Sequence, residues 1–575
     1  MLGGAVAVFV GILYIGTLAP TVLPYGAPDT LDSPMLQTEV TVLGVGHPTG
    51  YPTYMMLTHL FTFLPIGDPA YRVNLASAIY GAAAVFAVYL AGLRLGGKPV
   101  AAAAGALAFG LSGAFWSQAV IAEVYTFEAL LVTLVILFLF LWRDRRDSRY
   151  LLLSVFLVGL SLTHHLTSVL LIPAAVVFVF LTDRRVFSRT GLILKGLGLF
   201  LLGLLPLLYL PIRALMHAPL NEADPSTPWR FLLLITGGSF LAESSEKGRH
   251  CSPSSLALAD ASNKLELFGD HLLGQFPLIL MLVGVLAAVY LLFTDRATAI
   301  LLGVLFFGCL GQAAVYLQLG IEDFYVFLIP AFLVFGLCIS AGLGVLLRWV
   351  ERPMIGSTAG AVLVVALSVL MLFIPLLGVR KAYVEHDRSK DYAARKTIEA
   401  VASKVEKGAT VLHHRSPLWY MVLVEGRRRD LTLIDPFCTS WDRHTDIIWP
   451  DQISAAKAAG RYGTGDTTGV ETARRAARSG PVYLLANGRA RLVSFREAGF
   501  DAVPVDKDGL LYELVPRVPN LGNDPDRRVT PGRLSGIASR IIYNRNRLGI
   551  RVSERGGRHG ERSFRCAHDA GDWFC

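Results

Sequence analysis

The chain has 575 residues, of which 53% are hydrophobic and only 17% charged, and its mean hydropathy is +0.51. This composition excludes an ordinary soluble protein and indicates a polytopic membrane protein. The net charge of +9 does not indicate a nucleic-acid partner, because the arginines fall mainly in short loops between apolar segments and at the C-terminus.

Eleven apolar segments follow one another along the chain. Each has roughly the 20 residues that an α-helix needs to cross about 30 Å of hydrocarbon. The expected segments are 2–20, 72–94, 99–118, 124–142, 150–165, 166–182, 190–212, 274–294, 297–319, 324–348 and 357–379. We therefore expect an α-helical membrane domain with about 11 transmembrane helices. The boundary between the fifth and sixth segments, at residue 165, is the least clearly marked in the sequence.

Basic residues are concentrated in alternate loops between these segments. They are Arg94, Lys98, the runs 143–149 and 183–185, Arg296, Arg348 and Arg352. By the positive-inside rule these loops are cytoplasmic. The expectation is an integral, multi-pass protein of a bacterial plasma membrane, with the remaining loops and the C-terminal domain on the non-cytoplasmic side.

The first outer loop, residues 20–71, is polar and contains Asp29, Asp32 and His47. At the water boundary such side chains stay hydrated yet close to a lipid-borne substrate, which makes the loop a candidate site. The alternative is that the aspartates are turn and cap residues in PDTLDSP and that the His47 ring packs on a nearby tyrosine.

Further polar residues interrupt apolar sequence on the same side. Glu123, in FWSQAVIAEVYTF, is costly at a membrane boundary unless it is hydrogen-bonded or functional. His164 and His165, in LSLTHHLTSVLLIP, can line a polar cavity or anchor the chain at the interface. Arg213 follows a long apolar span and can bind a lipid phosphate, or simply extend toward a headgroup.

The composition changes after Arg380. The stretch DYAARKTIEAVASKVEKG has helical patterning, and ATVLHH, DLTLID and PVYLLAN are short β-type runs. We expect a membrane domain over 1–380, a small soluble α/β domain outside the membrane over 381–523, and an Arg- and Gly-rich tail over 524–575 that lacks the apolar pattern of a folded core.

Several of these motifs, in order, resemble one family. GHPTGYPTY, RVNLASAIYGA, FWSQAVIAEVYTF, GLSLTHHLTSVLLIP, LYLPIRA and EDFYVFLIPAF resemble a multi-pass family similar to the protein O-mannosyltransferases and other GT-C glycosyltransferases. The resemblance covers about 10–350 and extends weakly into GATVLHHRSPLWYMVLVEGRRRDLTLIDP. The family commonly has an Asp-Ser-Gly-Glu type motif in the first outer loop; here Asp32 and Ser33 match, but Pro34 and Met35 replace Gly and Glu.

The resemblance implies transfer of a sugar, for instance mannose, from a polyprenyl-phosphate donor to an extracytoplasmic protein or glycan acceptor. It implies that Asp32 is the base, with Asp29 as the second choice, and that Arg213 is the phosphate partner. The residues expected to line the donor or acceptor pocket are His47, Tyr51, Glu123, Tyr125, His164 and His165. No cofactor is predicted, and the sequence leaves a divalent metal open. The remaining partners are membrane lipids.

Two other classes of function fit the same composition. A lipid or glycolipid transporter or flippase would place charges near mid-membrane in broken helices and use both faces. A catalytically degenerate membrane scaffold is suggested by Pro34 and Met35. The polar residues gather at one face, which favours the transferase.

Overall fold

The structure is a computed structural model. It describes residues 1–25, 32–238, 257–318, 323–352, 357–435, 466–486 and 489–517. Residues 1–517 form the first of two units of the chain, and this unit is compact. The predicted tail, 524–575, lies outside the described residues, and the predicted boundaries at 380 and 523 stay predictions.

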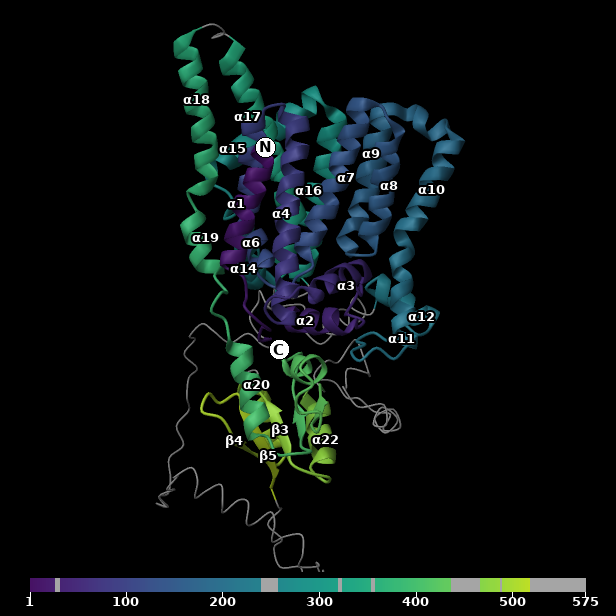
Figure 1. The fold of residues 1–575 in the computed structure, drawn as a ribbon, viewed down its shortest axis with the longest axis vertical. Coiled ribbons are helices and arrows are strands. Elements are labelled where there is room, and N and C mark those ends of the chain that lie inside the picture. Colours follow the sequence, from purple (N-terminus) through teal and green to yellow (C-terminus); the bar gives the residue numbers. More distant parts are fainter. Residues whose placement is uncertain are drawn as a thin grey trace, which may run out of the picture. The chain divides into compact units, whose positions relative to one another are not determined.

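Most of the first unit is a bundle of apolar helices (Figure 1). Its elements are α1 (Leu2–Gly16), α4 (Pro69–Gly96), α5 (Pro99–Gly110), α6 (Gly113–Ala119), α7 (Tyr125–Arg145), α8 (Ser148–Leu162), α9 (Leu171–Asp183), α10 (Thr190–Leu204), α11 (Tyr209–Leu215), α14 (Ala257–Leu273), α15 (Leu278–Thr294), α16 (Arg296–Gln318), α17 (Ile329–Glu351), α18 (Thr358–Phe373) and α19 (Val379–His386). The shorter helices α2 (Ser33–Val42), α3 (Pro52–His59) and α12 (Pro228–Ile235) lie at one end of the bundle.

The predicted class, a polytopic helical membrane protein, is confirmed. Seven helices in the described parts are long and apolar enough to cross a membrane, or up to nine if each of two bent pairs is one span. All eleven predicted segments overlap a helix or a helix pair. The first and fifth, at Leu2–Gly16 and Ser148–Leu162, have 15 residues each, which is about 22 Å and shorter than a full crossing.

Sequence signals at both ends of α4 explain where this long helix begins and ends. The Asp68 side chain accepts a 2.8 Å hydrogen bond from the backbone N–H of Tyr71, and Pro69 occupies the first turn. Gly97 ends the helix with a φ of 66°, a conformation that glycine adopts without strain. The cap fixes the point where the first long loop, residues 17–68, returns to the bundle.

The C-terminal part of the unit is a small mixed sheet with helices. Its elements are α20 (Ala393–Lys404), β1 (Thr410–Leu412), η9 (Tyr420–Val424), β2 (Thr432–Ile434), α22 (Asp466–Ala476), β3 (Val482–Leu485), α23 (Arg489–Glu497), β4 (Phe500–Pro504) and β5 (Leu511–Pro516). The strand order is β2-β1-β3-β5-β4; the first three strands are parallel, and β5 is antiparallel to both neighbours. The three β-type runs seen in the sequence are β1, β2 and β3, which confirms the predicted α/β character. We call residues 393–517 the sheet region.

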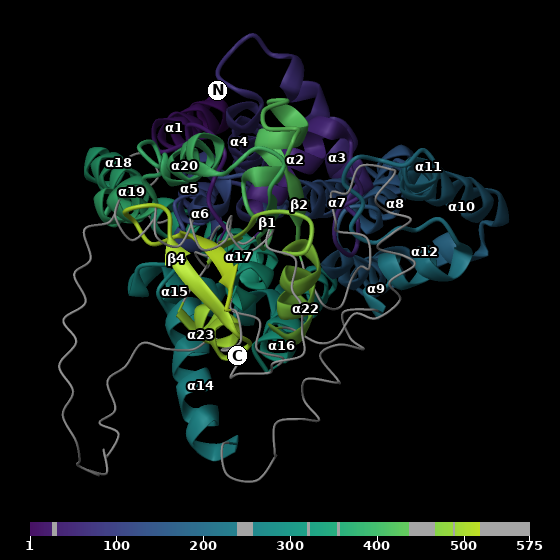
Figure 2. The same ribbon diagram turned by 90° about the horizontal axis from the view of Figure 1, so that it is seen from below.

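The sheet region packs against the first long loop rather than standing apart from it. Met35 of α2 and Ala70 of α4 share a buried apolar cluster with Trp419 and with Ile398 of α20. Figures 1 and 2 show the sheet at the end of the bundle that carries α2 and α3. The part of the loop that contains α2 is therefore buried between the helical bundle and the sheet region.

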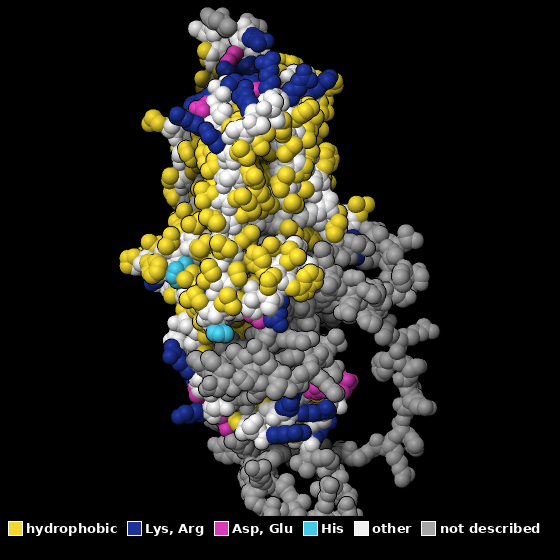
Figure 3. Space-filling model, turned by 90° about the vertical axis from the view of Figure 1, so that its right-hand side faces the viewer, with side chains coloured by type: hydrophobic (Ala, Val, Ile, Leu, Met, Phe, Trp, Pro, Cys, Tyr) yellow, Lys and Arg dark blue, Asp and Glu magenta, His cyan; other side chains and the backbone are white. Residues whose placement is uncertain are grey.

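The surface of the bundle matches a membrane environment. Figure 3 shows hydrophobic side chains along its flank, with Lys and Arg gathered at one end of the bundle. Helices α10 and α18 expose large side chains such as Leu194 and Val362. Exposed apolar side chains of this kind are stable against lipid but not against water.

Candidate active site

The start of α2 brings Asp32 into contact with two basic side chains. Asp32 is the N-cap residue, but its side chain makes no capping hydrogen bond. Oδ2 lies 3.3 Å from Nε2 of His47, and Oδ1 accepts a 3.1 Å hydrogen bond from Nη1 of Arg415. The Asp32 side chain is 19% exposed. The carboxylate is therefore held from two sides and still reached by solvent.

Aromatic rings connect His47 to a second histidine. The Tyr51 hydroxyl lies 3.0 Å from Nε2 of His47, and the Tyr51 ring stacks on His165 with centroids 6.0 Å apart and planes 9° from parallel. Nδ1 of His165 lies 3.0 Å from Oε2 of Glu128, and the Tyr125 ring packs edge-on against His165 at 5.6 Å. These contacts place four of the predicted site residues in one row that begins beside Asp32.

Burial sets the charge state of His47. Enclosure by the protein lowers the pKa of this imidazole, and the nearby Asp32 carboxylate opposes that shift only in part. Nε2 of the neutral ring lies against both the Asp32 carboxylate and the Tyr51 hydroxyl. Because a carboxylate can only accept hydrogen bonds, the ring can donate to Asp32 when its hydrogen is on Nε2.

Glu123 joins the site through its neighbour in the loop. Its Oε1 lies 3.4 Å from the hydroxyl of Ser33, the residue after Asp32. Burial raises the pKa of Glu123 well above its usual range, and the negative charges of Asp32 and Asp323 raise it further. Glu123 therefore favours its neutral form, which can donate a hydrogen bond to a substrate but is a poor base.

His164 lies behind the row rather than at its surface. It is completely buried, and its Nε2 lies 2.9 Å from the carbonyl oxygen of Val124. Burial lowers the pKa of His164 to about 4, so the neutral ring donates to that carbonyl. This contact ties the turn before α7 to the turn after α8, so His164 holds these two turns together behind the row; that it lines a substrate pocket stays a prediction.

Arg213 lies at the other end of α2. Its Nε and Nη2 donate to the carbonyl oxygens of Leu43 (2.7 Å) and Val42 (3.2 Å), the orphan acceptors at the helix C-terminus. Since α2 has ten residues, this end is about 15 Å along the axis from Asp32. Arg213 therefore contacts the same short helix as Asp32, but the structure does not bring the two side chains together.

Arg213 also lines an apolar groove at its end of α2. This groove has a volume of about 650 Å³ and lies among α8, α10 and α11, with Leu160, Leu202 and Tyr209 among its walls. Arg213 is the charged residue of its wall. An apolar groove with a cationic residue in its wall suits a lipid chain with an anionic head.

Besides Glu128, sequence analysis missed two further buried carboxyl groups in this region. Glu39 of α2 and Glu222, after α11, are both fully buried, and their carboxyl oxygens have no hydrogen-bond partner among the described residues. Burial raises the pKa of Glu39 well above its usual value, and it raises that of Glu222 to about 7. Arg415 bridges toward this pair, with Nη2 3.6 Å from Oε2 of Glu222.

Asp29, the second-choice base, lies outside the described residues, so the structure does not choose between the two aspartates.

Sequence analysis also missed Arg415, although the weak part of the family resemblance includes it in LHHRSPLWY. In the described parts of the chain, no three His, Cys, Asp or Glu side chains are grouped so as to hold a metal ion.

We expect Glu222→Gln to change how stability depends on pH. A carboxyl whose pKa rises from 4.5 to about 7 on folding must lose a proton at a cost to the folded state, so wild-type stability falls as pH rises from about 4.5 to 7. The variant removes this cost. It should be more stable than wild type at pH 8, by up to about 3 kcal/mol, and much closer to wild type at pH 5.

Thermal unfolding of the detergent-solubilised protein at both pH values measures this effect. Glu399→Gln is the matched control, because Glu399 is 62% exposed in an ion pair with Arg427, and exposed pairs contribute little. An unchanged gap between wild type and Glu222→Gln at pH 5 and pH 8 would contradict the assignment.

The fold is that of a polytopic helical membrane protein, with Asp32 and its basic partners in the first long loop and an apolar groove that Arg213 lines. The chain has a TM-score of 0.51 with the crystal structure of ArnT from Cupriavidus metallidurans bound to undecaprenyl phosphate, at 12% identity. That likeness covers 89% of this chain and 97% of ArnT. At this identity it shows the shared fold.

Sequence comparison identifies the relationship more closely. Residues 32–188 match the family model of the protein O-mannosyl-transferase TMEM260 N-terminal domain. The protein O-mannosyl-transferase TMEM260 of Mus musculus is 34% identical over 239 residues, which are 40% of this chain and 33% of the mouse protein. The predicted relationship to protein O-mannosyltransferases is confirmed, and the chain matches about a third of the length of this relative.

Proposed function

We propose that this protein is a membrane glycosyltransferase that moves a sugar from a polyprenyl-phosphate donor to a hydroxyl of a protein or glycan acceptor outside the cytoplasm. The observation that carries the proposal is the Asp32 carboxylate, held between His47 and Arg415 beside a row of aromatic and imidazole rings. The names of its relatives supply the sugar-transfer chemistry. Mannose is the first sugar to test.

In the proposed reaction the Asp32 carboxylate takes the proton of the acceptor hydroxyl. The acceptor oxygen then forms a bond to the anomeric carbon while the bond from that carbon to the phosphate oxygen breaks. Polyprenyl phosphate leaves with the bonding electrons. The neutral Glu123 and the rings of Tyr51 and His165 suit hydrogen bonding and stacking with a sugar.

Arg213 and its groove are the proposed site for the donor lipid. The apolar walls suit a polyprenyl chain, and a guanidinium at the groove suits its phosphate. Because Arg213 is about 15 Å from Asp32 along α2, we assign it to binding the donor phosphate on entry rather than to a group that touches the breaking bond. Helix α2, which has Asp32 at one end and the Arg213 contact at the other, would then lie between the acceptor site and the donor phosphate.

The test is a transfer assay with purified protein in proteoliposomes. Polyprenyl-phosphate mannose and polyprenyl-phosphate glucose, each labelled in the sugar, are supplied with extracytoplasmic protein and glycan fractions; GDP-mannose is the control donor. We expect labelled acceptor and free polyprenyl phosphate from a lipid-linked donor and none from GDP-mannose. Labelled lipid that crosses the bilayer with its sugar attached would instead identify a flippase, and no cleavage of any lipid-linked donor would overturn the proposal.

A further inference from the structure

Arg415 belongs to the sheet region, yet its side chain reaches the candidate base of the membrane domain. It follows β1 at the carboxyl end of that strand, 383 positions after Asp32 in the chain. The Arg415 side chain is 14% exposed. The contact therefore joins two parts of the protein that the sequence keeps far apart.

The backbone of Arg415 is anchored before its side chain leaves the sheet. Its N–H donates a 2.9 Å hydrogen bond to Oδ2 of Asp435, which follows the neighbouring strand β2. Asp435 is 3% exposed and is also contacted by Nδ1 of His414 at 3.1 Å. Arg415 has a φ of 38°, an unusual value for a residue with a side chain. The ends of the parallel strands β1 and β2 thus fix the position of the Arg415 backbone.

The guanidinium contacts two carboxyl groups of the described residues. Nη1 donates to Oδ1 of Asp32 at 3.1 Å, and Nη2 lies 3.6 Å from Oε2 of Glu222. The other oxygen of Asp32 faces His47. Each oxygen of the Asp32 carboxylate therefore has its own partner, which fixes both the position and the rotation of the group.

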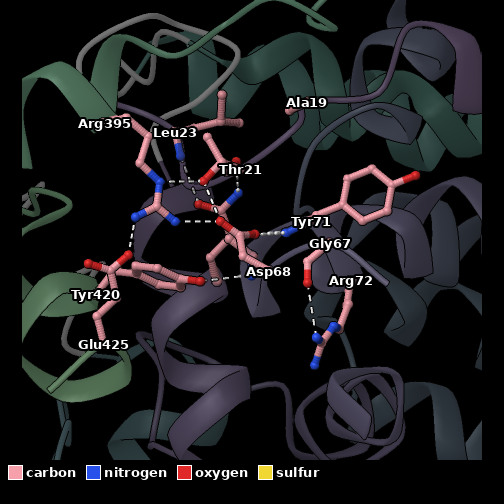
Figure 4. Close-up of polar contacts among 12 residues, drawn as sticks. Ala19, Thr21, Leu23, Gly67, Asp68, Tyr71, Arg72, Arg395, Tyr420 and Glu425 are labelled. Atoms are coloured by element: carbon pink, nitrogen blue, oxygen red, sulfur yellow. Dashed lines mark hydrogen bonds and ion pairs between the residues drawn. The ribbon is translucent and has the colours of Figure 1, made fainter. Parts of the chain in front are cut away.

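A second arginine holds the sheet region in place independently of Arg415. Figure 4 shows Arg395 of α20 among Thr21, Asp68 and Glu425. Its guanidinium lies over the Tyr420 ring, 5.4 Å from the centroid. Together with the buried cluster around Trp419, this contact anchors the sheet region, so the Arg415 contact is not needed for docking alone.

We propose that Arg415 is a positioning residue that orients the Asp32 carboxylate for proton abstraction, so that the sheet region completes the active site. This inference rests on the proposed function. It gives the C-terminal part of the chain a role in the chemical step, because a base rotated or displaced by about 1 Å can lose roughly 100-fold in rate.

The experiment compares Arg415→Met, Arg415→Lys and Arg395→Met in the lipid-linked transfer assay. We expect Arg415→Met to lower kcat by about 10- to 100-fold with little change in donor KM. Arg415→Lys should recover part of that loss because it keeps the positive charge. Arg517→Met is the matched control, since Arg517 is 51% exposed in a surface ion pair with Asp501; it should retain wild-type turnover.

Limited proteolysis between α19 and α20 separates positioning from docking. Arg395→Met should increase cleavage there, whereas Arg415→Met should not. An equal increase in both variants, or a wild-type kcat in Arg415→Met, would overturn the inference.

A double-mutant cycle supplies a readout that does not need activity. If Arg415 acts through Asp32, the shifts in Tm caused by Arg415→Met and Asp32→Asn will be non-additive in the double variant, which should also be no less active than Asp32→Asn alone. Additive shifts in Tm would overturn the inference even if wild type proves inactive and the proposed function fails. If the shifts in Tm are non-additive but the wild-type protein shows no turnover, both the proposed function and the positioning role of Arg415 are rejected. Only the contact between Arg415 and Asp32 is then supported.

Discussion

Asp32→Asn should lose about 10²- to 10⁴-fold of transferase turnover, the usual contribution of a general base. The substitution keeps the size of the side chain and its acceptor oxygen toward Arg415, but an amide cannot take the proton of an acceptor hydroxyl. Donor binding at the groove should change little, because Arg213 and the groove walls are at the other end of α2. The measurement is kcat with a labelled polyprenyl-phosphate sugar.

Asp29→Asn is the informative companion variant. It should keep most of the activity if Asp32 is the base. Thermal unfolding of both variants must match wild type closely enough to exclude misfolding as the cause. Wild-type turnover in a folded Asp32→Asn protein would end the assignment, and a loss confined to Asp29→Asn would move the role to that residue.

The helical architecture could be predicted because the membrane imposes it. Spans need long apolar runs, and basic loops punctuate them, so the positions of the helices follow from hydropathy. The local part of the site was also accessible, since His47 and Tyr51 are four residues apart in the same loop as Asp32 and make the contacts expected of neighbours. The break between α8 and α9 at 163–165 falls where the sequence was least marked.

Long-range contacts could not be predicted in the same way. Arg415 follows a strand of only three residues, and nothing in LHHRSP indicates that its guanidinium meets Asp32. Glu222 lies in a polar loop, where an exposed side chain is the usual expectation, yet it is fully buried. The hydrogen bonds of Arg213 could not be predicted either. No pattern in the sequence at the end of α2 indicates that its carbonyl groups accept from an arginine far along the chain.

The substitution of Met35 for the family's glutamate has a physical explanation in the structure. Met35 is completely buried and packs with Trp419 in the cluster that joins α2 to the sheet region. A charged side chain at that position would be costly without a partner. Glu39, one turn later in α2, places a carboxyl near Arg415 and Glu222 instead. Helix α2 therefore still has a buried carboxyl, one turn after Met35.

Gly105→Leu should leave little or no folded protein. Helices α5 and α17 approach so closely that a Cβ at position 105 would lie 2.3 Å from the carbonyl oxygen of Gly336 and 2.1 Å from Oγ of Ser340. Small residues at such crossings let membrane helices pack backbone against backbone. A leucine must force the two helices apart, at a cost above about 3 kcal/mol, which exceeds typical overpacking because backbone atoms block the space.

Gly311→Leu separates this packing effect from the chemistry of the substitution. Gly311 lies in α16, another apolar helix, and a Cβ there meets no atom of the described residues within 4 Å. Because leucine favours helix by roughly 1 kcal/mol over glycine, this variant should be as stable as wild type or slightly more so. The yield of monodisperse protein in detergent and its Tm measure both variants. Equal yields and Tm values would show that α5 and α17 do not pack through Gly105, and Gly105→Ala should fall between the two because its single methyl group still meets the Gly336 carbonyl.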